Sequence, residues 1–315
     1  MIAILGAGAF GAAIAQAPGG EIRLWGRGLA PGMAEAPRLP GHRFPRHVQV
    51  AGSIAEAVSG AEIILLAVPM GAQRETLDAM PQATAPLIAC SKGIDPETGL
   101  GPVGTIVAAG RGPAGLLTGP SFARDIARGL PTALTLAMPD GADGANGADG
   151  AAAQERLSSR AIRPYRSSDI TGAELGGALK NVLAIASGAV IGAGLGPSAQ
   201  AALLTRGFAE VTRLAVAEGA RKETLMGLSG MGDLMLTAYS PESRNYRYGH
   251  ALGRGETFAE ATTVEGVATA AAVARLAARR GLDLPVLTTT HRLISGELAL
   301  TPAMETLMSR PLKEE

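Results

Sequence analysis

The sequence IAILGAGAFGAAIA, residues 2–15, gives the strongest indication of how the chain is built. Its apolar run predicts a buried strand, and the small residues that follow predict the start of a helix. Between them lie Gly6, Gly8 and Gly11, in the spacing G-x-G-x-x-G. In that spacing the first glycine permits a tight turn, the second lets the backbone approach a pyrophosphate, and the third lets the helix pack closely on the strand. The segment therefore predicts a dinucleotide-binding turn, and the alternative is a glycine-rich turn without a ligand.

Short apolar runs recur through the first half of the chain, separated by helical or loop segments. They predict strands over residues 2–5, 22–25, 63–68, 87–90, 115–118 and 133–138, with a further short strand over 163–167. Strands that alternate with helices indicate βαβ units and a doubly wound, mostly parallel sheet. The segment 138–152 is rich in Gly, Asp and Ala, which predicts a mobile surface loop.

The pattern becomes helical from Asp169 onward. Apolar residues at helical spacing predict helices over 173–191, 198–219, 222–229, 242–253, 256–261, 266–280, 287–295 and 301–308. We therefore expect an α/β plus all-α protein. A Rossmann-like doubly wound sheet would occupy residues 1–168 and an all-helical domain residues 169–315.

Composition limits the classes of partner. The 315 residues are enough for about two domains, and 28 basic residues balance 28 acidic ones. This balance predicts neither nucleic-acid binding nor attachment to a membrane surface. The single cysteine, Cys90, excludes an internal disulfide and fits a reducing compartment. The apolar start lacks the basic residues of a signal peptide, and glycines and a proline interrupt the uncharged stretch 182–204. We therefore expect a cytoplasmic protein without a membrane span.

Lys180 is the most unusual residue of the second half. It lies in ELGGALKNVLAIASG, residues 174–188, which is apolar on every helical face and therefore predicts a buried helix. A lone ammonium group there has two interpretations. Either the side chain packs along the helix and its head reaches water, or it carries out proton transfer in a buried site.

Two basic residues follow predicted strands at the edge of the sheet where open α/β proteins bind ligands. Arg27 comes directly after the second strand, where NAD-specific sites usually have an acidic residue that binds the ribose 2′-hydroxyl. An arginine can hold a 2′-phosphate instead, which favours NADP. Lys92, in CSKG, follows another strand and could face a substrate or cofactor. Each could equally be a solvated loop residue.

Three further segments contain polar residues suited to an anionic ligand. Ser121 follows a Gly-Pro turn, and Asp233 lies among glycines and apolar residues in LSGMGDLMLT. The segment SPESRN supplies Ser243, Arg244 and Asn245, and the planar guanidinium of arginine suits a phosphate or carboxylate. Taken alone, these would be a helix start, a helix cap and a surface arginine.

Seven short motifs occur in order along the chain: GAGAFG, ACSKG, GPSFA, ELGGALKNV, GMGDLMLT, SRN and VEGV. Together they resemble the bacterial type of NAD(P)-dependent glycerol-3-phosphate dehydrogenase, over nearly the whole chain. The resemblance implies an N-terminal Rossmann-like domain and a C-terminal helical domain. It also implies interconversion of dihydroxyacetone phosphate and sn-glycerol 3-phosphate, which supplies phospholipid synthesis.

The resemblance also implies roles for individual residues. Lys180 matches the catalytic proton donor and acceptor, and Lys92, Asp233 and Thr237 match residues that act with it. Cofactor contacts are implied at Gly6, Gly8, Ala9, Phe10, Gly11, Arg27, Lys92, Ala123, Arg244, Thr263 and Glu265. Substrate contacts are implied at Lys92, Gly119, Ser121, Lys180, Asp233, Ser243, Arg244 and Asn245. No metal is implied. The family often has Ser where this chain has Ala9, which removes one hydroxyl contact but leaves the backbone N–H groups.

Two other functions fit parts of this pattern. A related dehydrogenase of a small hydroxy or keto acid would also use an arginine for its anion. A non-catalytic dinucleotide-binding regulator would keep the N-terminal glycines but would not need Lys180 or Asp233. We expect the phosphorylated triose as substrate, NADP or NAD as cofactor with NADPH preferred, and a homodimer.

Overall fold

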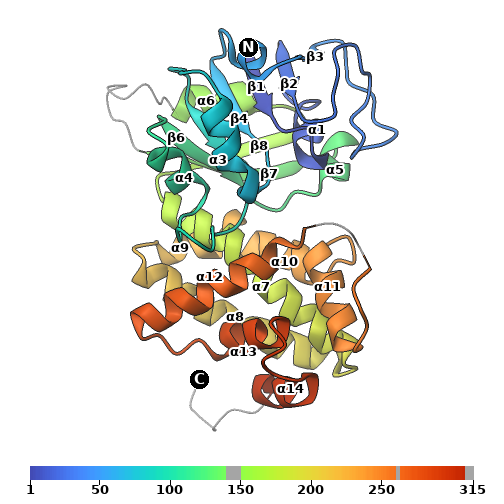
Figure 1. Cartoon of the computed structure of the whole chain (residues 1–315), viewed down its shortest axis with the longest axis vertical. Helices are drawn as coiled ribbons and strands as arrows, with labels where there is room; N and C mark the ends of the chain where they lie inside the picture. The colour runs from blue at the N-terminus through green and yellow to red at the C-terminus, as the bar shows by residue number, and fades with distance from the viewer. Residues whose placement is uncertain (140–149, 260–262, 309–315) are drawn as a thin grey trace. The chain divides into compact units, whose positions relative to one another are not determined.

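The chain divides into two units in the computed structural model, which describes residues 1–139, 150–259 and 263–308 (Figure 1). One unit comprises Met1–Lys92 and Leu100–Glu174, and the other comprises Gly93–Gly99 and Leu175–Glu315. Each is described by itself below.

The first unit is built on an eight-stranded sheet in the order β3-β2-β1-β4-β5-β6-β7-β8. The strands are β1 (Ile2–Leu5), β2 (Ile22–Trp25), β3 (Val48–Val50), β4 (Ile63–Leu66), β5 (Leu87–Ala89), β6 (Ala114–Thr118), β7 (Thr132–Ala137) and β8 (Ile162–Ser167). Every neighbouring pair is parallel except β6 and β7. The order 3-2-1-4-5-6 is that of a Rossmann sheet, in which ligands bind where the strand order reverses, here beside β1 and β4.

Apolar side chains cover both faces of this sheet. Because successive side chains of a strand point to opposite faces, Ile2 and Ile4 join one core while Ala3 and Leu5 join the other. The helices of this unit are α1 (Ala9–Ile14), α2 (Ile54–Val58), α3 (Met70–Ala79), α4 (Pro102–Ala108), α5 (Ala123–Ala127) and α6 (Gly150–Leu157). The prediction of a doubly wound, Rossmann-like sheet is confirmed.

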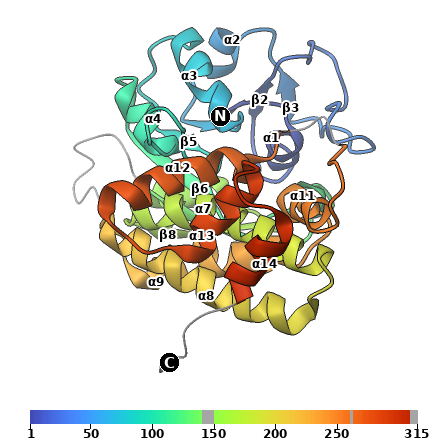
Figure 2. The same cartoon turned by 60° about the horizontal axis from the view of Figure 1, so that its bottom comes forward.

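All regular elements in the described part of the second unit are helices. Its helices are α7 (Ile170–Gly192), whose first residues belong to the other unit, α8 (Gly196–Ala217), α9 (Lys222–Met226), α10 (Asp233–Ala238), α11 (Arg244–Gly253), α12 (Glu265–Arg280), α13 (Pro285–Ile294) and α14 (Leu300–Met308). A π-helical segment, η1 (Leu228–Gly232), leads into α10. Helix α13 contacts α8, α12 and α14 (Figure 2). Ile94, from the segment Gly93–Gly99, joins the core of these helices.

Helix α7 is the central element of this core. Its side chains from Ala178 to Val190 are almost all withdrawn from solvent. Among the described helices it alone is long and apolar enough to cross a membrane, but 89% of its most apolar window is buried. Such burial is typical of the core helix of a soluble protein.

Several predicted elements differ from the structure. The prediction of a helix over 256–261 is wrong, since residues 256–259 are not helical and 260–262 lie outside the described residues. Gly255 adopts a positive φ of 69° and the amide of Glu256 bonds back to Ala251, so α11 ends there. The predicted helix 222–229 ends at Met226. The three-residue edge strand β3 was too short and too exposed to stand out as an apolar run.

The predicted loop 138–152 is only partly testable. Met138 is buried and residues 150–152 begin α6, so both ends of that prediction are wrong. Residues 140–149 lie outside the described residues.

Candidate active site

The turn after β1 has the backbone shape that a pyrophosphate site requires. Gly6 adopts φ +118°, and a Cβ there would lie 2.5 Å from the carbonyl of Ala67, which follows β4. A Cβ on Gly11 would lie 1.9 Å from the carbonyl oxygen of Gly6, so α1 packs directly against the turn. A Cβ on Gly8 would meet no atom within 4 Å. Packing therefore requires the outer two glycines, while Gly8 leaves its side of the backbone open.

The first turn of α1 presents unused donors beside this opening. The amides of Ala9, Phe10 and Gly11 donate to no backbone acceptor in the described part of the chain, and the helix has no side-chain cap. Such amides are suitable ligands for phosphate oxygens, so the residues present fit the predicted dinucleotide. Arg27 follows β2 and lies 3.6 Å from Glu75, with both side chains largely exposed.

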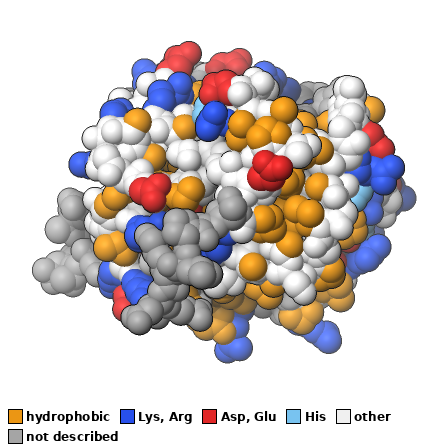
Figure 3. All heavy atoms as spheres, turned by 90° about the horizontal axis from the view of Figure 1, so that it is seen from below, with side chains coloured by type: hydrophobic (Ala, Val, Ile, Leu, Met, Phe, Trp, Pro, Cys, Tyr) orange, Lys and Arg blue, Asp and Glu red, His pale blue; other side chains and the backbone are white. Residues whose placement is uncertain are grey.

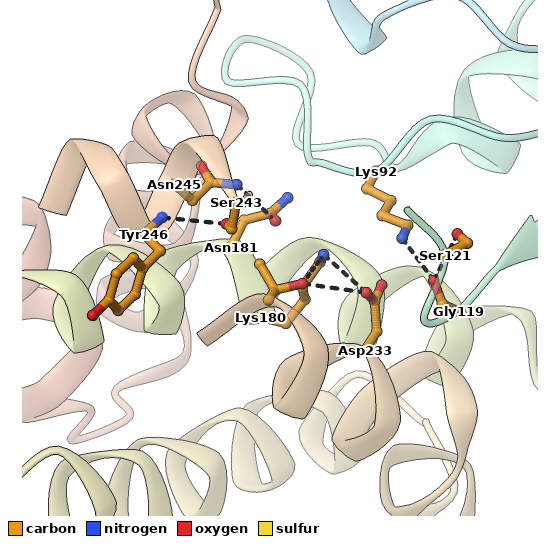
Figure 4. A network of polar contacts seen from close by, with 10 residues as sticks. Lys92, Gly119, Ser121, Lys180, Asn181, Asp233, Ser243, Asn245 and Tyr246 are labelled. Carbon is orange, nitrogen blue, oxygen red and sulfur yellow. Dashed lines mark hydrogen bonds and ion pairs between the residues drawn. The ribbon is translucent and has the colours of Figure 1, made fainter. Parts of the chain in front are cut away.

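A second polar cluster lies at the carboxyl ends of β5 and β6 (Figure 4). The Lys92 Nζ donates to the carbonyl of Gly119 at 3.0 Å, and the Ser121 hydroxyl donates to the same oxygen at 3.1 Å. Gly119 adopts φ +137°, a conformation that L side chains rarely adopt. The structure therefore brings together three predicted site residues, and Ala123 opens α5 close by in sequence.

Lys180 forms a buried cluster with two residues of α10 (Figure 4). Its side chain is only 9% exposed, and that of Asp233 is 1% exposed. The Nζ donates to Asp233 Oδ1 at 3.0 Å and to Thr237 Oγ1 at 2.6 Å, and the Thr237 hydroxyl lies 3.3 Å from the same Oδ1. The head of Lys180 is therefore hydrogen-bonded inside the protein, and little of the side chain is exposed. Buried ion pairs are expensive to form and weak sources of stability, and they are frequent in functional sites.

Local packing explains why Asp233 meets Lys180. One turn of α7 before the lysine, a Cβ on Gly176 would lie 2.9 Å from the carbonyl oxygen of Ser229 in η1. Only a glycine lets η1 approach α7 this closely. The π-helical segment then passes directly into α10, whose first residue is Asp233. π-Helical segments are rare in proteins overall, but those that occur are often found at functional sites.

The start of α11 carries a neighbouring polar network. Ser243 caps the helix by accepting from the amide of Tyr246 at 3.2 Å. Asn245 donates from Nδ2 to Asn181 Oδ1 at 2.9 Å and accepts from the amide of Gly266 at 3.0 Å. Arg244, between the two predicted residues, is exposed.

Asn181 is a candidate that the sequence reasoning missed. It is 2% exposed, and within the described residues its Nδ2 donates to no acceptor. A buried unpaired donor is costly and therefore suggests a ligand. The available signal was its place beside Lys180 in an otherwise apolar helix.

The remaining predicted residues lie at the margins of these clusters. Glu265 opens α12, directly before the Gly266 that binds Asn245. Thr263 precedes that helix and is exposed. Arg27 forms its ion pair with Glu75 and belongs to none of the clusters.

Comparisons with known proteins agree with this geometry. The family model of the NAD-dependent glycerol-3-phosphate dehydrogenase N-terminus matches residues 1–143, and that of the C-terminus matches residues 169–305. A glycerol-3-phosphate dehydrogenase (NAD(P)+) of Cereibacter sphaeroides is 54% identical, with 100% of both chains covered. One of Paracoccus denitrificans is 50% identical, covering 100% of this chain and 99% of the relative.

Solved structures give the same result. The crystal structure of glycerol-3-phosphate dehydrogenase from Coxiella burnetii matches with a TM-score of 0.88 and 33% identity, covering 98% of each chain. A ketopantoate reductase from Ralstonia eutropha reaches a TM-score of 0.58 at 15% identity, which shows a shared fold and no more. On the two family models and the full-length relatives, the chain belongs to the NAD-dependent glycerol-3-phosphate dehydrogenase family.

Proposed function

We propose that this chain catalyses the reversible, NAD(P)H-dependent reduction of dihydroxyacetone phosphate to sn-glycerol 3-phosphate. The observation that carries the proposal is the buried ammonium of Lys180, held by Asp233 and Thr237 in a largely apolar core. Any buried ammonium needs polar partners, but a buried ion pair is a weak source of stability and is frequent in functional sites. The relatives named glycerol-3-phosphate dehydrogenase support the substrate.

Lys180 is the proton donor and acceptor in this proposal. When bound, the nicotinamide supplies the hydride for reduction and accepts it in oxidation. In reduction, Lys180 gives its proton to the ketone oxygen as that oxygen gains negative charge, and in oxidation it takes the hydroxyl proton back. Asp233 and Thr237 hold Nζ in one place, so little reorganisation is needed when the proton moves.

Two groups of polar residues would bind the substrate. Arg244, with Ser243 and Asn245, would hold the phosphate, since arginine makes paired charge-assisted hydrogen bonds to phosphate oxygens. The unpaired Nδ2 of Asn181 is a further donor for a substrate oxygen. Lys92, Gly119 and Ser121 complete the proposed substrate-binding set.

The cofactor would be held mainly by backbone groups of the glycine turn. Gly6, Gly8 and Gly11 set its shape, and the amides of Ala9 and Phe10 would bind the pyrophosphate. Lys92, Ala123, Arg244, Thr263 and Glu265 are the other proposed contacts.

Preference for NADPH depends on Arg27. Its ion pair with Glu75 is solvent-exposed, and exposed pairs contribute little, so a 2′-phosphate could replace the carboxylate at small cost.

The wider setting follows from the family. We propose that residues 1–168 bind the dinucleotide and residues 169–315 bind substrate and supply the proton. We also propose a cytoplasmic enzyme that supplies phospholipid synthesis. A homodimer is proposed as well, supported by the hydrophobic side chains that gather over part of the face in Figure 3.

A direct assay tests the reaction. The purified chain is mixed with dihydroxyacetone phosphate and NADPH, absorbance of the reduced nicotinamide is followed, and the measurement is repeated with NADH. Rapid oxidation that needs the triose phosphate supports the proposal, and faster oxidation of NADPH supports the role of Arg27. A folded chain that binds nucleotide but oxidises neither cofactor would contradict it. A screen of keto acids would then separate the related dehydrogenase from the non-catalytic regulator.

A further inference from the structure

A second buried polar cluster lies at the far end of α10 and contains no charge. The Ser187 hydroxyl of α7 donates to the carbonyl oxygen of Ala238 at 2.7 Å. The Gln200 amide of α8 donates to the Ser187 oxygen at 2.8 Å and to the same Ala238 carbonyl at 3.3 Å. Ser187 is 0% exposed and Gln200 is 4% exposed. Two side chains from two helices therefore converge on one backbone oxygen.

This cluster lies in line with the catalytic lysine along α7. Ser187 follows Lys180 by about two helical turns, and Gly176 precedes it by about one, so the three residues share one face of the helix. The same face contacts η1 at Gly176, Asp233 and Thr237 at Lys180, and Ala238 at Ser187. The segment from η1 through α10 is thus fixed to α7 at three successive points.

The contact of Ser187 with the Ala238 carbonyl stabilises the end of a short helix. Helix α10 runs only from Asp233 to Ala238, and the last carbonyls of a helix have no donor within it. Ala238 directly follows Thr237, whose hydroxyl accepts from Lys180. A shift of the Ala238 carbonyl would therefore move that hydroxyl, and with it the turn that carries Asp233.

We propose that Ser187 and Gln200 are positioning residues for the reduction, which hold the end of α10 so that Thr237 and Asp233 stay against Lys180. The inference rests on the proposed dehydrogenase function. The hydrogen bonds given above for Ser187 and Gln200 go to Ala238 and to each other, so we infer that their effect on the lysine passes through α10. Their effect belongs in kcat, because displacement of catalytic groups by fractions of an ångström slows the chemical step.

The test compares Ser187→Ala with a matched control. Thr290→Val removes a buried hydroxyl-to-carbonyl hydrogen bond of the same 2.7 Å length, from Thr290 to Val286 within α13, without loss of volume. We expect similar decreases in melting temperature for both variants. Only Ser187→Ala should lose kcat, roughly tenfold, with KM values for dihydroxyacetone phosphate and NADPH nearly unchanged.

A double-mutant cycle distinguishes positioning from general destabilisation. In a Thr237→Ala background, Ser187→Ala should lower the melting temperature as before but cause a smaller further loss of kcat, because only the contact of Asp233 with Lys180 is left to disturb. Equal kcat losses in both backgrounds would overturn the inference, as would wild-type kcat in folded Ser187→Ala.

A second variant keeps the inference testable if Ser187→Ala does not fold. Gln200→Met keeps the side-chain length and removes both amide donors, and we expect a smaller kcat loss in the same direction. Unchanged kcat in folded Gln200→Met would also count against the inference. An inactive wild-type chain would instead contradict the proposed function, so the two failures are distinguishable.

Discussion

Helices α10 and α11 both pack on α7, yet they are held in opposite ways. Helix α11 is held mainly by close contact between backbones, beside the hydrogen bond from Asn245 to Asn181. A Cβ on Gly249 would lie 1.9 Å from the carbonyl oxygen of Ile185, and one on Gly188 would lie 2.1 Å from that of Tyr246. Gly192 and Gly253 repeat this relation one turn further along. Glycines on both helices therefore let them approach until their main chains touch.

Helix α10, in contrast, is held by polar side chains. Lys180 binds Asp233 and Thr237, and Ser187 binds the carbonyl of Ala238. Backbone contact leaves α11 little freedom, which suits a helix that begins with the proposed phosphate-binding residues Ser243–Asn245. Polar contacts hold α10 just as specifically and also supply the groups that move a proton. The contrast indicates that α11 serves binding and α10 serves chemistry, and each half of this statement can be tested.

The largest effect should come from removing the charge that α10 contacts. Lys180→Met keeps the stem of the side chain but removes the proton donor, and we expect kcat to fall by about 10²–10⁴-fold. Stopped-flow or steady-state assays of cofactor oxidation measure this, with binding of both ligands checked by calorimetry. Near-normal turnover in a variant that binds both ligands would exclude Lys180 as the proton donor.

The same variant should also destabilise the fold, because Asp233 keeps a buried carboxylate without its cation, at a cost of about 3 kcal/mol. Adding Asp233→Asn should recover most of that free energy of unfolding but none of the kcat. Recovery of activity in the double variant would show that Lys180 matters only as a structural partner.

The next effect concerns the backbone contact of α11. In Gly249→Ala the new methyl group overlaps the carbonyl oxygen of Ile185, and backbone cannot move aside cheaply. We expect a loss of about 3 kcal/mol in the free energy of unfolding, measured by urea denaturation. Gly71→Ala in α3 is the matched control, since a Cβ there meets no atom within 4 Å. A glycine in a helix is less favourable than alanine by up to about 1 kcal/mol, so the control should be neutral or stabilising. Equal behaviour of the two variants would contradict the account of α11.

A smaller effect should separate binding from chemistry. In Arg244→Met, kcat/KM for dihydroxyacetone phosphate should fall by the equivalent of about 1.5–3 kcal/mol, with far less change for unphosphorylated dihydroxyacetone. Arg254→Met, at the other end of α11, is the control and should affect the two substrates alike. Equal losses on both substrates in Arg244→Met would remove the phosphate role.

The sequence was sufficient for the parts that depend on local pattern. Apolar runs located six of the eight strands, because a sheet covered on both faces needs continuous hydrophobic residues. The strand over 163–167 was predicted as well, although its sequence is not an apolar run. The unusual Lys180 was visible because charge in an apolar helix is rare. Its pairing with Asp233 was expected only from the family resemblance, since the two residues are 53 positions apart.

What the sequence concealed depends on contacts between distant segments. Ser187 and Ala238 are separated by 51 residues, and a serine in a helix gives no sign of the carbonyl it will bind. The glycines of α7 and α11 resemble ordinary small residues until the two helices are packed. The role of Glu174 could not be predicted from the sequence either, because the helix that it caps lies more than 70 positions earlier in the chain.

The cap that Glu174 of α7 forms on α4 is a third way in which α7 holds a neighbouring helix. The smallest effect that we expect comes from changing it. The partly buried Glu174 Oε1 accepts from the amide of Val103 at 2.6 Å, at the start of α4, where the N-cap Gly101 has no side chain to do so. Burial raises the pKa of the Glu174 carboxyl from 4.5 to about 7, and the amides of Val103 and Gly104 oppose that rise.

A pKa above its unfolded value means that the folded chain binds this proton more tightly. The fold therefore loses stability as pH rises from about 4.5 to about 7, and the loss is complete above that range. Because the glutamine of Glu174→Gln cannot ionise, this variant should not lose that stability. Its free energy of unfolding should therefore rise relative to that of the wild type as pH increases over this range. We expect a change of about 1–2 kcal/mol, allowing for the partial exposure of the carboxylate.

Denaturant unfolding at pH 4.5, 6 and 7.5 measures the difference, with the exposed Glu223→Gln as control. A difference between Glu174→Gln and wild type that stays constant with pH would mean that the α4 amides stabilise the carboxylate as strongly as burial disfavours it. In that case α7 would hold α4 through a carboxylate that is charged at pH 6 and 7.5, as it holds α10 through the charged Lys180.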